Sequence, residues 1–148
     1  MEGIKPKAVI FDIDDTLSET DHRQPLAVAK QWSAFYDELP NDEPMKTVEI
    51  LEALWEQGIC IILLTSRPDK YRIPTMEWLN KHSVKYSALL MRPADKPYVK
   101  DAEIKLKHYT DYIQPNYDVI AVFDDRKQCV DMWRKIGLLC FQPQESNF

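Results

Sequence analysis

Glycine is scarce in this sequence, because only Gly3, Gly58 and Gly137 occur among its 148 residues. The phosphate-binding loop of P-loop kinases has the pattern GxxxxGK[ST], which glycines at these positions cannot form. The sequence therefore contains no P-loop kinase domain. Its length favours a single domain, 1–148, with enough residues to bury a core on both faces of a small sheet.

Cysteine is also rare and has no regular spacing. Cys60 and Cys140 lie in apolar runs and Cys129 lies in a helical stretch. No CxxC or HxxxH pair is present, which argues against a zinc site. An odd number of cysteines in such positions is typical of reduced core thiols, and we expect a cytoplasmic protein.

Long apolar runs are absent, so we expect no membrane-spanning segment. The N-terminal stretch MEGIKPKAVIF is interrupted by Lys5, Pro6 and Lys7 and does not have the pattern of a signal peptide. The net charge of −5 argues against a broad basic face that binds duplex nucleic acid. It leaves open the binding of one end of a strand.

Short apolar runs alternate with amphipathic stretches along the chain. The predicted strands are Ala8–Phe11, Ile59–Leu64, Ala88–Met91, Val119–Phe123 and Leu138–Phe141. The predicted helices are Gln24–Leu39, Met45–Gln57, Pro74–His82, Lys100–Ile113 and Lys127–Ile136. The run ICIILL shows no polar alternation, as expected of a parallel strand covered on both faces. The fold class is therefore α/β, with a doubly wound (Rossmann-like) parallel five-stranded sheet and helices on both faces.

Acidic and hydroxyl side chains follow three of these strands. The residues are Asp12, Asp14, Asp15 and Thr16, then Thr65, Ser66 and Arg67, then Asp124, Asp125 and Arg126. In doubly wound folds, ligands bind beyond the carboxyl ends of the strands. Clustered carboxylates without His or Cys favour a hard cation with oxygen ligands, and Mg²⁺ is the usual one.

This arrangement resembles the haloacid dehalogenase (HAD) superfamily of phosphatases. DIDDT after the first strand, a Thr after the second, a downstream Lys and a late DD pair carry the resemblance. More specifically, KAVIFDIDDTL, TSRP and FDDRKQCVDMWRKIGLLCFQ are similar to the 3′-phosphatase domains of phage polynucleotide kinase-phosphatases. Two positions depart from that pattern, since Asp15 and Ser66 each replace a glycine.

The resemblance implies a role for each acid. Asp12 would be the nucleophile that forms an aspartyl-phosphate. Asp14 would be the general acid and base, and its backbone carbonyl would face the metal. Asp12 and Asp124 would bind Mg²⁺, and Asp125 would bind it directly or through a water molecule. Thr65 would donate a hydrogen bond to a phosphoryl oxygen.

A lysine is needed to steady the phosphorylated aspartate, and Lys96, Lys100 and Lys105 are candidates. The spacing in DAEIK is similar to that of the family, so we choose Lys105, with Asp101 as its orienting partner. The alternative is an exposed Asp–Lys pair on a helix, four residues apart.

The resemblance also implies substrate contacts. Arg23 and Arg67 would grip the phosphate, and Ser66, Asp101 and Arg126 would lie beside it. The alternative for Arg23 is a solvated loop residue. Trp32 and Phe35 could stack on a base, although their helical spacing favours a place in the core.

The segment 18–44 is too short for more than a minimal cap, so a macromolecular end can enter the site. We therefore expect a Mg²⁺-dependent phosphatase acting on the 3′-phosphate ends of DNA or RNA, with room for a separate kinase or ligase on the same ends. A small-molecule phosphatase or nucleotidase is the alternative. A phospho-accepting receiver-like domain is more remote, because receivers carry the acceptor aspartate on the third strand.

Overall fold

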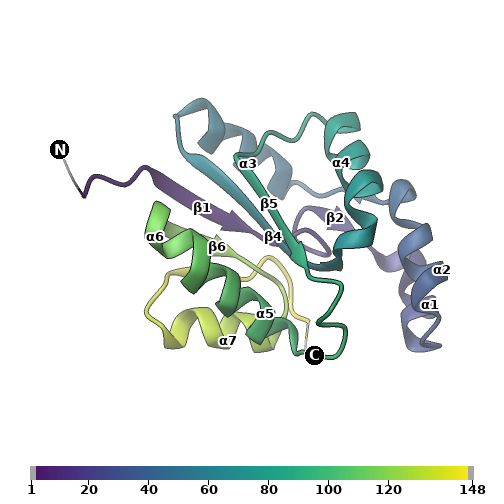
Figure 1. Cartoon of the computed structure of the whole chain (residues 1–148). Coiled ribbons are helices and arrows are strands. Elements are labelled where there is room, and N and C mark those ends of the chain that lie inside the picture. Colours follow the sequence, from purple (N-terminus) through teal and green to yellow (C-terminus); the bar gives the residue numbers. More distant parts are fainter. Residues whose placement is uncertain (1–2, 147–148) are drawn as a thin grey trace.

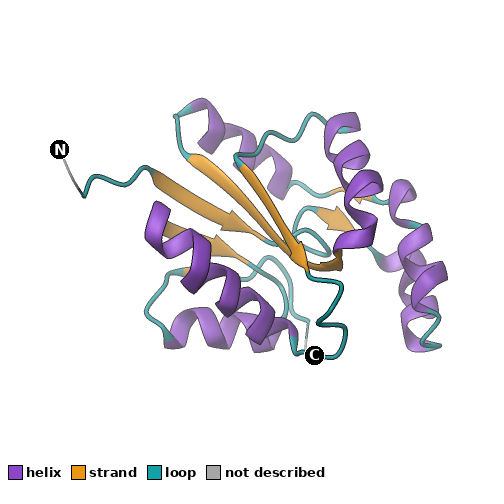
Figure 2. Cartoon of the chain, viewed as in Figure 1, coloured by secondary structure: helices purple, strands orange, loops and turns teal. Residues whose placement is uncertain are grey.

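A computed structural model describes residues 3–146 and places five parallel strands at the centre of the molecule (Figures 1 and 2). The strands are β1 Lys7–Phe11, β4 Cys60–Pro68, β5 Ala88–Arg92, β6 Asp118–Phe123 and β7 Cys140–Phe141. Their order across the sheet is β5-β4-β1-β6-β7. The predicted parallel five-stranded sheet is confirmed. The chain builds one half of the sheet from β1 outward and then crosses back to build the other half, which creates a crevice between β1 and β6.

Helices cover both faces of the sheet (Figure 1). They are α3 Thr47–Glu56, α4 Arg72–Lys81, α5 Asp101–His108 and α7 Lys127–Lys135. Successive residues of a strand point to opposite faces. Val9 and Phe11 therefore belong to the core beneath α3 and α4, and Ala8 and Ile10 belong to the core beneath α5 and α7.

The register of the strands aligns their carboxyl ends. Phe11 pairs with Leu63 on one side and with Phe123 on the other. The amide of Asp12 continues the pairing and donates to the carbonyl of Phe123 at 2.9 Å. As a result, the residues that follow β1 and β6 emerge side by side.

The segment 18–44 forms a small cap rather than the predicted single helix Gln24–Leu39. Strands β2 Ser18–Glu19 and β3 Glu43–Pro44 pair antiparallel at its base. Between them lie the 3₁₀ turns η1 Asp21–Arg23 and η2 Leu39–Asn41 and the short helices α1 Gln24–Val28 and α2 Trp32–Asp37.

The break between α1 and α2 is a Schellman motif. The amide of Gln31 donates to the carbonyl of Leu26 at 2.8 Å, and that of Lys30 donates to Ala27 at 2.9 Å. Lys30 is left-handed, with φ 58°. Glycine usually marks this position, so a lysine there gives no signal in the sequence. The break leaves Val28 83% exposed instead of packed in a continuous apolar face.

The predicted helix Lys100–Ile113 is also interrupted. Helix α5 passes into a π-helical turn, Tyr109–Ile113, and then into α6, Gln114–Asn116. Pro115 supplies no N–H for an α-helical bond, and its ring would collide with the carbonyl four residues earlier. The wider turn accommodates it.

The three cysteines are free thiols, as predicted. Cys129 and Cys140 are buried and Cys60 is half-buried. Over the described span 3–146, no helix is long and apolar enough to cross a membrane.

Candidate active site

The acidic residues predicted from the strand ends meet at one point. Asp12, Asp124 and Asp125 are all buried, and each has an oxygen within 4.8 Å of the others. They lie at the carboxyl edge of the sheet, and Asp12 and Asp125 line a cavity of about 650 Å³. Three carboxylates this close repel one another unless a cation compensates them.

Lys105 supplies part of the compensating charge. Its Nζ lies 3.1 Å from Oδ1 of Asp12 and 2.8 Å from Oδ2 of Asp124. Burial alone would lower the pKa of Lys105, but the charges of Asp12 and Asp124 raise it well above its usual value. Lys96 and Lys100, the other candidates, are exposed.

One lysine does not balance three acids. Burial raises the pKa of Asp125, and the neighbouring charge of Asp12 raises it further. Burial likewise raises the pKa of Asp124, although Lys105 opposes that shift. The cluster therefore has the charge and the oxygen donors for a divalent hard cation.

Asp15 lies outside this cluster. Its Oδ1 accepts from the hydroxyl of Thr20 at 2.7 Å and from the amide of Thr20 at 3.2 Å. Its backbone is left-handed, with φ 61°. Aspartate tolerates this conformation better than most residues, which explains how it can replace the usual glycine.

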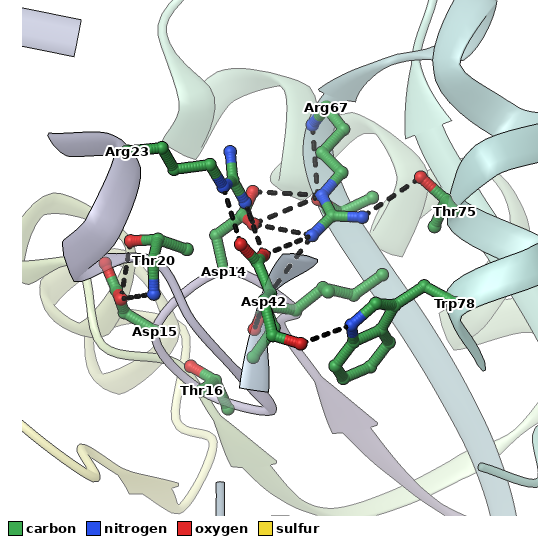
Figure 3. Close-up of polar contacts among 12 residues, drawn as sticks. Asp14, Asp15, Thr16, Thr20, Arg23, Asp42, Arg67, Thr75 and Trp78 are labelled. Atoms are coloured by element: carbon green, nitrogen blue, oxygen red, sulfur yellow. Dashed lines mark hydrogen bonds and ion pairs between the residues drawn. The ribbon is translucent and has the colours of Figure 1, made fainter. Parts of the chain in front are cut away.

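Asp14 is held by two buried arginines, Arg23 and Arg67 (Figure 3). Nη2 of Arg23 donates to Oδ1 at 2.6 Å, and Nη2 of Arg67 donates to the same oxygen at 2.7 Å. Nε of Arg67 also contacts both oxygens of Asp14, at 3.1 and 3.2 Å. Burial alone would raise the pKa of Asp14, but the charges of Arg67 and Arg23 outweigh it and lower the pKa.

Arg23 and Arg67 therefore both bind Asp14 in this structure, and their contact with the substrate phosphate stays a prediction. Arg23 is fully buried and Arg67 is 1% exposed. Arg23 also donates two hydrogen bonds to Asp42, at 2.7 and 2.8 Å, and lies 4.3 Å from the ring centre of Phe35. Both arginines hold the Asp14 carboxylate through hydrogen bonds, and Arg67 also lines the cavity.

Sequence reasoning missed Asp42, which lies just before β3 in the cap. Its carboxylate binds Arg23 and the ring of His22, and its backbone carbonyl accepts from Nε1 of Trp78 at 2.9 Å (Figure 3). No spacing marks this residue. Two buried guanidinium groups nevertheless require more than one carboxylate, which is a charge argument that could have prompted a search for it.

The proposed pair of Asp101 and Lys105 is wrong. Asp101 instead forms ion pairs with Arg92 and Arg126. Arg92 was also missed, although it ends β5 and the same strand-end argument applies to it. Asp101 and Arg126 nonetheless line the cavity with the acids.

The side chains of Thr65 and Ser66 lie in the site, as predicted. The hydroxyl of Thr65 accepts from the amide of Arg67 at 3.2 Å, so its own hydrogen remains available to a ligand. Oγ of Ser66 is buried and makes no hydrogen bond within the described residues. Both side chains line the cavity.

The prediction for Trp32 was wrong and that for Phe35 was right. Phe35 is buried beneath Arg23, whereas Trp32 is 52% exposed and lines the cavity. Trp32 is the first residue of α2, and Phe35 lies one turn further along the same helix.

Comparison with known proteins identifies the family. The model of the polynucleotide kinase PNKP phosphatase domain matches residues 6–148. The chain belongs to this family of PNKP phosphatase domains. Membership places it among the phosphoric monoester hydrolases and agrees with the resemblance found in its motifs.

Several relatives support the assignment. One relative is a protein of Autographa californica nuclear polyhedrosis virus that is named as a bifunctional polynucleotide kinase/RNA ligase. It is 32% identical over 138 residues, which cover 90% of this chain and 18% of the viral protein. A chain in the Pnkp1/Rnl/Hen1 RNA repair complex is 37% identical with a TM-score of 0.86, over 97% of this chain and 44% of its own length. This PNKP-type chain thus spans less than half of either relative.

More distant structures share only the fold. The haloacid dehalogenase-like family protein SP0104 from Streptococcus pneumoniae has a TM-score of 0.65 at 11% identity, over 93% of this chain and 84% of its own. The PNKP-type domain therefore has the HAD fold.

Proposed function

We propose that this chain is a Mg²⁺-dependent polynucleotide 3′-phosphatase that works through an aspartyl-phosphate. The observation that carries the proposal is the buried cluster of Asp12, Asp124 and Asp125, with Lys105 joining two of them at an open cavity. Such a cluster suits attack on phosphorus by one carboxylate while the others hold a cation.

The metal would be held by Asp12, Asp124 and Asp125, together with the backbone carbonyl of Asp14. When bound, Mg²⁺ supplies positive charge that neutralises the phosphoryl oxygens and lets an anionic nucleophile approach. The donor set fits this ion, because it consists of oxygen atoms and its negative charge exceeds what Lys105 balances.

In the first step, an oxygen of Asp12 attacks phosphorus and the bond from phosphorus to the 3′-oxygen breaks. The leaving oxygen takes a proton from Asp14, which must carry that proton and rotate away from Arg23 and Arg67 to deliver it. Thr65 donates to a phosphoryl oxygen, and Lys105 offsets the charge at Asp12.

In the second step, water attacks the phosphorus of the aspartyl-phosphate. Asp14, now ionised, takes the proton of that water, and the bond from phosphorus to Asp12 breaks to release inorganic phosphate. The two arginines favour the ionised form of Asp14, which is the form that this step requires.

The nucleic acid substrate is inferred from the family and from the shape of the site. One closer relative is named as a polynucleotide kinase/RNA ligase and the other belongs to an RNA repair complex. The cap is small, with two short helices, two 3₁₀ turns and one pair of two-residue strands. Such a cap leaves the cavity open to a strand end. The same relatives support a kinase or ligase as a partner on those ends.

The test compares one oligonucleotide phosphorylated at its 3′ end or at its 5′ end, together with the matching nucleoside 3′-monophosphate. We expect Mg²⁺-dependent phosphate release from the 3′-phosphorylated strand, loss of release with a chelator, and no release by Asp12→Asn. Preference for the mononucleotide would favour the nucleotidase alternative. Full activity without metal would refute the mechanism.

A further inference from the structure

Two aromatic side chains line the catalytic cavity yet remain largely in water. Trp32 is 52% exposed and Tyr98 is 97% exposed. They come from different parts of the chain, Trp32 from the cap and Tyr98 from the loop between β5 and α5. Tyr98 gains almost nothing from burial in the fold, and Trp32 leaves about half of its surface in water, so packing in the core does not account for these exposed aromatic surfaces.

The loop that carries Tyr98 is firmly held. Nη1 of Arg92 donates to the carbonyl of Lys96 at 2.8 Å and to that of Val99 at 2.6 Å, and Nε donates to the carbonyl of Ser66 at 3.1 Å. Arg92 is itself 7% exposed. Tyr98 is thus presented on a backbone anchored on both sides, which reduces the entropy cost of using it to bind.

Trp32 is also held in place by packing against its neighbours. Its ring lies edge-on to Phe35, with 5.7 Å between the ring centres, and Phe35 in turn covers Arg23. The indole is therefore supported from behind by the arginine network that holds Asp14, while half of its surface stays open.

The cavity is much larger than a phosphate group. Its volume of about 650 Å³ falls in the range of sites for nucleotide-sized ligands. The acids and Lys105 account for the phosphate. The rings of Trp32 and Tyr98 at the cavity would suit a flat apolar group that is joined to this phosphate.

We propose that Trp32 and Tyr98 stack on the base of the 3′-terminal nucleotide. This inference rests on the proposed function and deepens it, because the substrate becomes a strand whose last base is unpaired. Stacking is tolerant of base identity, since every base has a π-face. A terminal base held in a duplex is stacked and paired and cannot enter without paying for its release.

The experiment compares two 3′-phosphorylated single strands that differ only in the terminal residue, a normal nucleotide or an abasic one. We expect wild type to show a kcat/KM about tenfold or more higher for the strand with the base. Trp32→Ala and Tyr98→Ala should each lower kcat/KM for that strand, mainly through KM, and leave the abasic strand unchanged. Trp32→Phe should restore most of the loss.

Trp55→Ala is the matched control, because Trp55 is 36% exposed on α3 and lies outside the cavity lining. It should not change either rate. Equal losses on both strands, or no loss with either variant, would overturn the stacking proposal. If wild type releases phosphate equally from both strands, the stacking proposal is overturned but the proposed function stands. If no 3′-phosphorylated strand releases phosphate, the proposed function itself is refuted.

Discussion

Asp12 and Asp14 are two residues apart and have opposite surroundings. Asp12 shares a buried site with two other acids and one lysine, whereas Asp14 accepts hydrogen bonds from two arginines. The first environment suits a carboxylate that attacks phosphorus beside a cation. The second favours the ionised form of Asp14, so the proposed proton transfer requires this side chain to leave the two arginines.

Asp14→Asn tests the proton-transfer role. We expect phosphate release from a 3′-phosphorylated strand to fall by about 10²–10⁴, because its alkoxide leaving group needs a proton. An aryl phosphate should still give a rapid burst of phenol, because its leaving group departs unaided. Rapid-quench measurement on both esters separates the steps. An equal loss of the first turnover on both esters would remove Asp14 from the general-acid role.

Acid titration of stability tests the arginine network. The folded pKa of Asp14 lies below its ordinary 3.8. As the pH falls below 3.8, the unfolded chain takes up a proton that the folded chain does not, so the free energy of unfolding declines. Urea titrations between pH 5 and 2.5 should show this decline by up to about 1.4 kcal/mol per pH unit.

Asp14→Asn should make that decline shallower, whereas Asp21→Asn, on the exposed side of η1, should leave it as in wild type. The same decline in both variants would mean that other acids account for the acid sensitivity.

At the scale of elements, four Schellman motifs end helices within residues 3–146, and two of these four contain glycine. Gly58 and Gly137 close α3 and α7, whereas Lys30 and Ser83 close α1 and α4. All four residues are left-handed. The motif is the same backbone device in each case, but only glycine makes it visible in a sequence.

Exchanging these residues should have opposite effects on stability. Lys30→Gly should raise the free energy of unfolding by about 0.5 kcal/mol, because relief of the left-handed strain exceeds the added entropy of the unfolded chain. Gly58→Ala should lower it by about 1 kcal/mol through strain alone, since no atom lies within 4 Å of the added Cβ. Chemical denaturation measures both, and a loss in Lys30→Gly would contradict the prediction.

These motifs also explain what the sequence could predict. The strands and their ends could be predicted, because continuous apolar runs indicate buried parallel strands and ligand-binding residues follow the carboxyl ends of such strands. Asp12 and Asp124 follow from this reasoning, and Lys105 follows from the family pattern. A small cap at 18–44 was predicted, but the break between its two helices was not recoverable, because Lys30 conceals a helix end. Asp42 was missed because it becomes part of the site only when the cap folds over Arg23.

At the scale of the whole molecule, the metal site proposed at the acidic cluster should couple folding to Mg²⁺ binding. Mg²⁺ should raise the Tm, since it binds only the folded arrangement. Asp125→Asn should raise the Tm without Mg²⁺ by removing repulsion, and it should abolish most of the increase with Mg²⁺. Asp124→Asn should not match this gain, because Asp124 also accepts from Lys105 at 2.8 Å and from Nε1 of Trp133 at 3.2 Å.

Thermal unfolding with Mg²⁺ and with a chelator measures these effects. Ca²⁺ serves as the comparison, because it is larger and should support little phosphatase activity even where it stabilises the fold. A Tm of Asp125→Asn below that of wild type in the chelator would show that repulsion in the cluster is already relieved.

The net charge of −5 and the burial of Arg23 and Arg67 set the salt dependence. Because both arginines are engaged by Asp14, they are not available to replace counterions along a bound strand. The slope of log(kcat/KM) against log salt should therefore be shallow, about −1 to −2, at roughly 0.7 per phosphate contacted on a single strand. Lengthening the strand beyond about three nucleotides should add little. Steady-state rates from 50 to 400 mM salt on strands of two, three, six and twelve nucleotides measure both effects. A slope steeper than about −4, or a rate that keeps rising with length, would instead require an extended basic track.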